Sequence, residues 1–201
     1  MSLSKKKYIV IPVLLLLIIF VGSIAYLNED SEPDPQINKV VNLSANSITF
    51  NEINKLDEFA ELVVIGYATD EFIDREHVVT AFDDGTMQSF HTNTNIKIEK
   101  ILKKPDDFPS DQKELTIIEP VSLDGDVKYT ADHYVELQKD DKSVIFLMKN
   151  TFGNYGLIND NLGKFSLEQT NQSKLSQSFT SKELSEYELF RDSVMESYNI
   201  N

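Results

Sequence analysis

Apolar residues follow three kinds of pattern along the chain: one unbroken run near the start, short runs in the middle and a helical stripe at the end. The unbroken run, Tyr8–Leu27, spans 20 residues without Asp, Glu, Lys or Arg. As a helix it is about 30 Å long, which matches the hydrocarbon thickness of a bilayer. Pro12 falls in its first turn, where proline is tolerated. The pattern therefore predicts a transmembrane helix over residues 8–27.

Charges on either side of this run predict its orientation. Lys5, Lys6 and Lys7 precede it, and four acids follow within the next seven residues. The positive-inside rule places residues 1–7 in the cytoplasm and everything after residue 27 outside the cell. A cleavable signal peptide is the alternative, since Ser23 and Ala25 have the spacing that signal peptidase reads and would be cut after Ala25. Signal peptides usually have shorter apolar cores, which favours an uncleaved anchor at the cell membrane.

Residues 28–47 combine acids, two prolines and small polar residues without a sustained apolar period, which is typical of a tether. The pattern then changes to one stripe of a short helix, formed by Ile53, Leu56, Phe59 and Ala60. Thr49 or Ser47 is the expected cap of this helix.

Residues 48–168 contain at least six short runs that predict strands. Some are continuously apolar, which is typical of buried strands, and others alternate. The predicted strands are 62–69, 78–82, 87–92, 95–102, 114–119, 144–148, 155–158 and 164–167. The last two are expected to pair around an Asn-rich turn.

Local signals add detail to three of these strands. Asp83-Asp84-Gly85 predicts a tight turn between antiparallel strands, because Asp-Gly readily supplies positive φ. Alternation at Ile96 and Ile98 breaks phase at Ile101, which predicts a bulge. Asp124-Gly125-Asp126 marks a further turn. Together these signals predict a mainly β (α+β) domain, a small antiparallel β-barrel or sandwich flanked by a short helix and a C-terminal helix.

The C-terminal part begins with a polar linker at 169–180. Thr180 and Glu183 then have the spacing of a capping box, and apolar side chains recur at helical spacing from Leu184 to Tyr198. We expect an amphipathic helix over 181–201 that packs against its own β domain rather than an external partner.

The runs ELVVIGYATD, NIKIEKILKK, ELTIIEP, SVIFLMKN and YGLINDNLGKFSLE, between Glu58 and Leu167, carry a resemblance. The chain resembles small single-pass or secreted extracytoplasmic β-domain proteins of Bacillus-type Gram-positive bacteria, whose function is mostly unassigned. The resemblance implies a cell-surface setting and transfers no active site.

Composition narrows the chemistry. The chain has no cysteine, which excludes disulfides, thiol nucleophiles and thiolate zinc sites. Its net charge of −14 becomes −17 after residue 27, because the first 27 residues hold three lysines and no acid. This charge disfavours nucleic acid and other polyanions, and it favours cations or basic partners.

Three histidines show no spacing typical of a metal site. His77 and His91, on the two arms of the predicted hairpin, form a zinc or pH-sensing pair only if they lie opposite each other. Calcium is an alternative, because six aspartates lie in turns: Asp83, Asp84, Asp124, Asp126, Asp140 and Asp141. Turn formation explains these aspartates equally well, and we predict no metal site and no cofactor.

Recognised catalytic patterns are also missing. Ser110, Ser122 and Ser143 lie outside any nucleophile motif, and 33 acids offer no basis for choosing an acid–base pair. Lys97, Lys100, Lys103 and Lys104 are expected on a solvated strand face. Four phenylalanines, which can line a groove but more often fill a core, are Phe72, Phe82, Phe90 and Phe108.

These observations favour a non-enzymatic, membrane-anchored domain that binds an envelope partner, with the lipid bilayer as its other contact. The alternatives are a hydrolase acting on envelope polymers or peptides, and a secreted protein released by cleavage after Ala25.

Overall fold

The computed structural model describes residues 37–45, 48–168 and 179–200 of the 201-residue chain. The predicted cytoplasmic tail and membrane anchor, the first part of the tether and most of the polar linker lie outside these residues. Among the residues described, no helix is both long and apolar enough to cross a membrane. The described residues from Ile37 onward form one compact unit.

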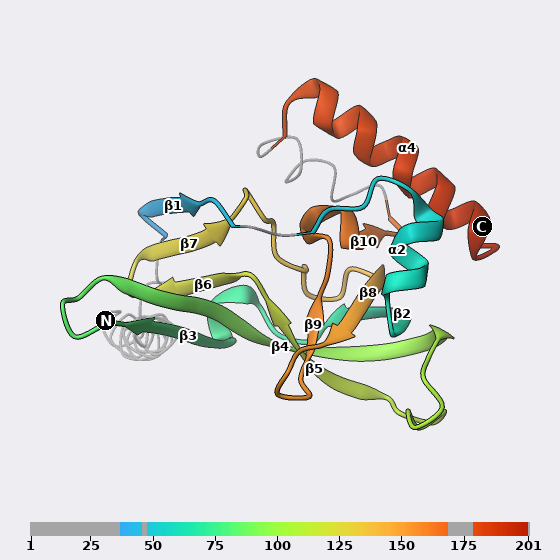
Figure 1. The fold of residues 1–201 in the computed structure, drawn as a ribbon, viewed down its shortest axis with the longest axis horizontal. Coiled ribbons are helices and arrows are strands. Elements are labelled where there is room, and N and C mark those ends of the chain that lie inside the picture. Colours follow the sequence, from blue (N-terminus) through green and yellow to red (C-terminus); the bar gives the residue numbers. More distant parts are fainter. Residues whose placement is uncertain (1–36, 46–47, 169–178, 201) are drawn as a thin grey trace, which may run out of the picture. The chain divides into compact units, whose positions relative to one another are not determined.

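Five strands close into a barrel in the order β8-β2-β4-β5-β9-β8 (Figure 1). The predicted barrel alternative is thus the observed one. The strands are β2 (Leu62–Ala68), β4 (Met87–Lys103), β5 (Glu114–Glu119), β8 (Ser143–Lys149) and β9 (Tyr155–Leu157).

Most neighbours in this barrel are antiparallel, but β5 and β9 meet in parallel at Ile118 and Gly156. Counted along the chain, the barrel strands close in the order 1-2-3-5-4, with the third and fifth parallel. This is the connectivity of an OB-type Greek-key barrel. A fold of this kind hosts many unrelated functions, so the site must be argued from its own residues.

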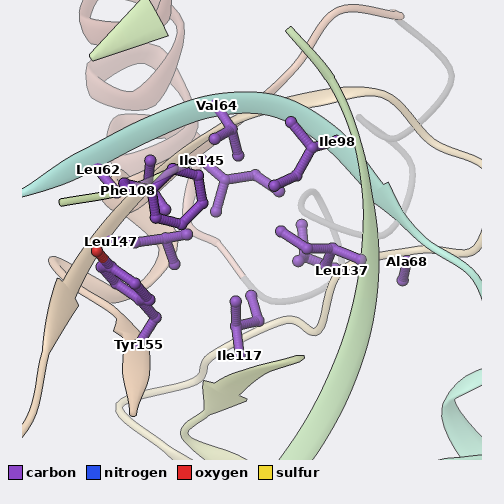
Figure 2. Close-up of a cluster of buried hydrophobic side chains, with 11 residues drawn as sticks. Leu62, Val64, Ala68, Ile98, Phe108, Ile117, Leu137, Ile145, Leu147 and Tyr155 are labelled. Carbon is purple, nitrogen blue, oxygen red and sulfur yellow. The ribbon is translucent and has the colours of Figure 1, made fainter. Parts of the chain in front are cut away.

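Strands β2 and β8 are buried on both faces, which explains their continuous apolar runs. Leu62, Val64, Ile145 and Leu147 point into the barrel, where they pack with Ile117 and other apolar side chains (Figure 2). The alternate residues of both strands belong to a second cluster on the outer face, formed with the two helices. Helices therefore cover the outer face of β2 and β8 (Figure 1).

Strand β4 is longer than predicted. The hairpin arm expected at 87–92 and the strand expected at 95–102 are one strand of 17 residues, Met87–Lys103. Polar residues at their junction made the sequence look like two strands. Two of them, Thr92 and Thr94, are fully buried in the continuous strand, where their hydroxyls donate hydrogen bonds inside the protein. The predicted bulge is confirmed: the pairing of β4 with β2 shifts by one residue between Ile98 and Lys100.

A three-stranded sheet in the order β1-β7-β6 lies beside the barrel. It comprises β1 (Lys39–Leu43), β6 (Val121–Asp124) and β7 (Val127–Ala131). The turn predicted at residues 124–126 joins β6 to β7. Strand β1 falls within the predicted tether, so that segment is partly structured. Its short apolar stretch has no strand period of its own and is ordered by parallel pairing with β7, almost ninety residues later in the chain.

The remaining strands, β3, β9 and β10, pair as follows. Strand β3 (Glu76–Ala81) forms the predicted antiparallel hairpin with β4, and Gly85 in its turn has φ 82°. The strands predicted at 155–158 and 164–167 exist as β9 and β10 (Lys164–Ser166), but they do not pair with each other. Each pairs instead with β8, and the short 3₁₀ helix η2 (Asp160–Gly163) lies between them.

The short helix α2 (Ile53–Phe59) lies where its stripe predicts it, but Glu52 is its N-cap and makes no side-chain capping bond. The expected cap at Thr49 or Ser47 is therefore wrong. Helix α4 (Ser181–Ser197) begins at the predicted capping box and buries Tyr187, Phe190 and Val194 against the barrel. The prediction that it packs on its own domain is confirmed. The remaining short helix is η1 (Phe72–Asp74).

The α4 cap gives a testable prediction. The Thr180 hydroxyl accepts from the Glu183 backbone N–H at 3.3 Å, so Thr180→Ala should lower the free energy of unfolding by about 1 kcal/mol. Urea denaturation of the full chain in non-ionic detergent measures this change. Ser181→Ala is the control, because Ser181 is exposed in the first turn and should change stability by less than about 0.5 kcal/mol.

Candidate functional site

A charged pair lies wholly inside the protein, where the end of β5 meets the segment before β3. The side chains of Arg75 and Glu119 are 1% and 0% exposed, and Arg75 Nη1 lies 3.0 Å from Glu119 Oε2. Buried ions of this kind are tolerated only when their remaining hydrogen-bonding capacity is used.

Both partners are fully engaged. Glu119 also accepts hydrogen bonds from the Thr94 hydroxyl, the Tyr134 hydroxyl at 2.6 Å and the Leu137 backbone N–H at 2.7 Å. Arg75 donates to the carbonyl oxygens of Asp70 and Leu137. Burial, followed by the charge of Glu119, raises the pKa of Tyr134 well above its usual value. This network ties β4, β5 and the loop after β7 together and leaves no group for a ligand.

Lys164 is a second buried charge. Its side chain lies against the Tyr134 ring, with Nζ 4.7 Å from the ring centre. Burial lowers its pKa from 10.5 to about 8, although Glu119, Glu136 and Asp141 oppose the shift. Nearby, Lys128 and Glu136 form a partly buried ion pair. Lys164 therefore loses its proton closer to neutral pH than an ordinary lysine does.

This lowered pKa makes stability depend on pH. The unfolded chain keeps the Lys164 proton up to about pH 10.5 while the folded chain releases it near pH 8, so stability should rise with pH across that window. Between pH 8 and 9.5 the gain is on the order of 1 to 2 kcal/mol. Lys164→Met should remove this rise in chemical denaturation curves. Lys182→Met, at an exposed position, should retain it; a rise of equal size in both variants contradicts the assignment.

A furrow runs beside the first half of α4. Two adjoining hollows of about 380 and 260 Å³ share Leu162 and Glu186. Apolar side chains contributed by α4, η2 and the residue before Thr180 form much of the lining: Leu162, Phe179, Leu189 and Phe190. We call this feature the α4 furrow.

Four carboxylates line the α4 furrow, and among the residues that the structure describes no Lys, Arg or His lines it. They are Asp132, Asp160, Glu183 and Glu186. Two hydrogen bonds donated by Thr180, from its backbone N–H and its hydroxyl, hold the pKa of Glu183 below its usual value. The furrow therefore combines an apolar lining with negative charge.

The walls of the furrow are rigidly held. The Asn159 side chain accepts from the Phe50 N–H at 2.7 Å and donates to the carbonyls of Phe50 and Leu162. The Asn161 side chain likewise accepts from the Val135 N–H and donates to the His133 carbonyl. Asn159, Asp160, Asp132 and His133 all have positive φ. Non-glycine residues adopt this conformation at an energetic cost, and side-chain bonds such as these stabilise it.

The three histidines do not converge. The β3–β4 register pairs His77 with Thr92 and His91 with Val78, so the two histidines occupy opposite faces of the hairpin. The paired zinc or pH-sensing arrangement is therefore wrong. His77 Nε2 donates to the Phe72 carbonyl and Nδ1 lies 2.9 Å from the Thr92 hydroxyl; burial is the main cause that lowers its pKa. His133 contacts Asn42 on β1.

The six candidate calcium aspartates lie in three separate turns, and three of them accept hydrogen bonds from other residues of the protein. Asp84 accepts from the Thr86 backbone N–H, Asp126 accepts from the Asn38 side chain and Asp141 accepts from Ser166. Within the described part of the chain, no group of three or more His, Cys, Asp or Glu residues is arranged to hold a metal ion.

The candidate serines and phenylalanines do not gather at one site either. Ser122 is buried and donates to the Val78 carbonyl, and Ser143 lies at the start of β8 beside Asp141. Phe108 is buried in the barrel core, as expected, whereas Phe82 is 55% exposed. Phe72 packs on His77 and Phe90 on Tyr129, so the four phenylalanines form no common groove.

Sequence reasoning missed the α4 furrow, because its carboxylates lie in three chain segments between Asp132 and Glu186 that only the fold brings together. The sequence features that overlap the furrow are the capping box at Thr180 and the Asn-rich turn, and neither indicates a site by itself. No family model matches the chain, and no curated protein is significantly similar to it.

Proposed function

We propose that this chain is a membrane-anchored, extracytoplasmic and non-enzymatic binding domain of the bacterial cell envelope. The apolar run at residues 8–27 and the lysines before it support the anchor and its orientation. The resemblance to extracytoplasmic β-domain proteins of Bacillus-type bacteria is consistent with this setting.

The observation that carries the binding role is the α4 furrow, where four carboxylates stand around an apolar lining and one of them, Glu186, pairs with exposed Lys182 at 3.5 Å. A ligand that matches both features is a protein segment with basic and apolar side chains. The chain's net charge of −14 attracts such a segment at long range and repels nucleic acid.

Topology is tested by adding protease to intact cells stripped of their wall. The full-length chain should fractionate with the membrane and lose its C-terminal domain to the protease. Protection of that domain in wall-stripped cells, or recovery of the intact chain in the cytosol, contradicts the anchor. The mass of the mature N-terminus separates an uncleaved anchor from release after Ala25.

Binding is tested with a synthetic peptide of lysine and leucine residues, titrated into the full chain in non-ionic detergent. Glu186→Lys reverses a charge shared by both hollows and should weaken binding about tenfold. Glu196→Lys makes the same change outside the furrow on the same helix and should leave binding unchanged. Equal affinity in both variants would reject the furrow as the site.

One observation bears on the hydrolase alternative: carboxylates meet in the furrow, as an acid–base mechanism requires. The low pKa of Glu183 makes that residue a poor general acid, which needs a proton near neutral pH. Screening the full chain against cell-wall and peptide substrates tests this alternative, and inert protein on all of them removes it.

A further inference from the structure

A separate hollow of about 440 Å³ lies between the end of β4 and the loop that follows it. Strands β4 and β5 pair only as far as Lys97 and Glu114, after which the Ile98 N–H donates to the Lys113 carbonyl. Beyond that point β4 continues to Lys103 and pairs with β2 alone. The loop of residues 104–113 therefore leaves the strand, and the hollow opens between them.

Contacts within the loop fix its shape. Phe108 inserts into the barrel core, where its ring meets Tyr155 edge-on at 5.9 Å (Figure 2). Its backbone N–H donates to the Pro105 carbonyl, and its own carbonyl accepts from the Lys104 ammonium at 2.8 Å. The loop is thus anchored by a buried side chain, and the hollow beside it is preformed.

Lysine dominates the lining, which is unusual for a chain of net charge −14. Four lysines line the hollow: Lys100, Lys103, Lys104 and Lys113. The one acid among the lining residues, Glu99, is engaged by Lys142 at 2.9 Å. The hollow therefore has an excess of positive charge.

Two of these ammonium groups are available to a ligand. Lys103 bonds Asp57 and Lys104 bonds Phe108. Lys100 and Lys113 are exposed, and their ammonium groups form no hydrogen bond or ion pair within the described part of the chain. The Ser110 hydroxyl, which also lines the hollow, is likewise uncommitted among those residues.

The donor set selects the chemistry of the ligand. Lysine is a compact point charge without the planar fork that arginine offers to a carboxylate. Two ammonium groups and a hydroxyl on different walls suit a group whose oxygens point in several directions and carry more than one charge. A phosphate group has this geometry. We propose that the hollow binds a phosphate-bearing ligand through Lys100, Lys113 and Ser110.

This site shares no residue with the α4 furrow, so it does not depend on the proposed function. Calorimetric titration of pyrophosphate into the full chain, in non-ionic detergent at pH 8, tests it. Wild-type protein should bind saturably, and Lys100→Gln/Lys113→Gln should bind at least about tenfold more weakly. Lys39→Gln/Lys182→Gln removes the same charge from exposed positions outside the hollow and should bind like wild type.

Circular dichroism should show both double variants folded, because all four lysines are exposed. Equal pyrophosphate affinity in the two variants overturns the site, as does the lack of saturable binding to wild type. Citrate, a tricarboxylate of similar charge, should bind at least about fivefold more weakly than pyrophosphate; equal affinity overturns the assignment to phosphate. Phosphatidylglycerol in the micelles distinguishes the sources: displacement of pyrophosphate assigns the hollow to a lipid headgroup, and no displacement assigns it to a water-soluble ligand.

Discussion

Glu119→Leu should lower the free energy of unfolding by about 3 to 5 kcal/mol, the range found when one partner of a buried ion pair is removed. The substitution leaves the Arg75 guanidinium charged inside the protein. It also removes the acceptor of Tyr134, Thr94 and the Leu137 backbone N–H. Each buried donor without a partner adds its own cost.

Denaturant titration of the full chain measures this effect. Lys55→Ala is the matched control, because it breaks an exposed pair with Glu52 and should cost less than about 1 kcal/mol. Arg75→Met combined with Glu119→Leu should recover part of the loss, since no charge then remains unpaired. Equal stability of the Glu119 and Lys55 variants would mean that the buried network contributes little.

The second large effect is expected at Gly163, where η2 passes close to the preceding turn. A Cβ atom at this position would lie 1.6 Å from the Ile158 carbonyl oxygen and 2.8 Å from its carbon. Both are backbone atoms, so a side chain cannot rotate away to relieve the clash. Gly163→Ala should cost at least about 3 kcal/mol, since the backbone of η2 must move.

The matched control is Gly156→Ala on β9, where the nearest atoms to a new Cβ are 3.9 Å away. That substitution meets only ordinary van der Waals contact and should change stability by less than about 1 kcal/mol. Thermal unfolding of both variants decides the matter. Similar midpoints for the two would show that the turn at residues 158–163 relaxes at little cost. Because Asn159, Asp160 and Leu162 line the α4 furrow, Gly163→Ala should also weaken peptide binding there.

Elements with a strong local signal could be predicted from the sequence. The apolar runs of β2 and β8, the Asp-Gly turn after β3 and the capping box of α4 all lie where residue periodicity and turn chemistry indicate. The bulge near Glu99 was visible as a break in alternation. These features depend on neighbours within a few residues, so a linear pattern contains the information.

The errors share one physical cause, which is that the deciding partner lies far away in the chain. Thr92 and Thr94 interrupt an apolar pattern but are buried, because acceptors on β5 and β6 meet their hydroxyls. Strand β1 forms on an edge supplied by β7, and β9 pairs with β8 rather than β10. His77 and His91 separate because pairing is offset by one residue, which reverses the face of a side chain.

By itself the sequence determined the class of the domain, the position of most strands and both helices, and the excess of negative charge, because composition and short-range periodicity carry these properties. Only the tertiary structure decided that the sheet closes into a barrel, that Glu119 meets Arg75 across 44 residues, and that carboxylates and lysines gather in two different hollows. Long-range pairing brings those groups together, and it depends on burial and backbone hydrogen bonds that no local pattern encodes.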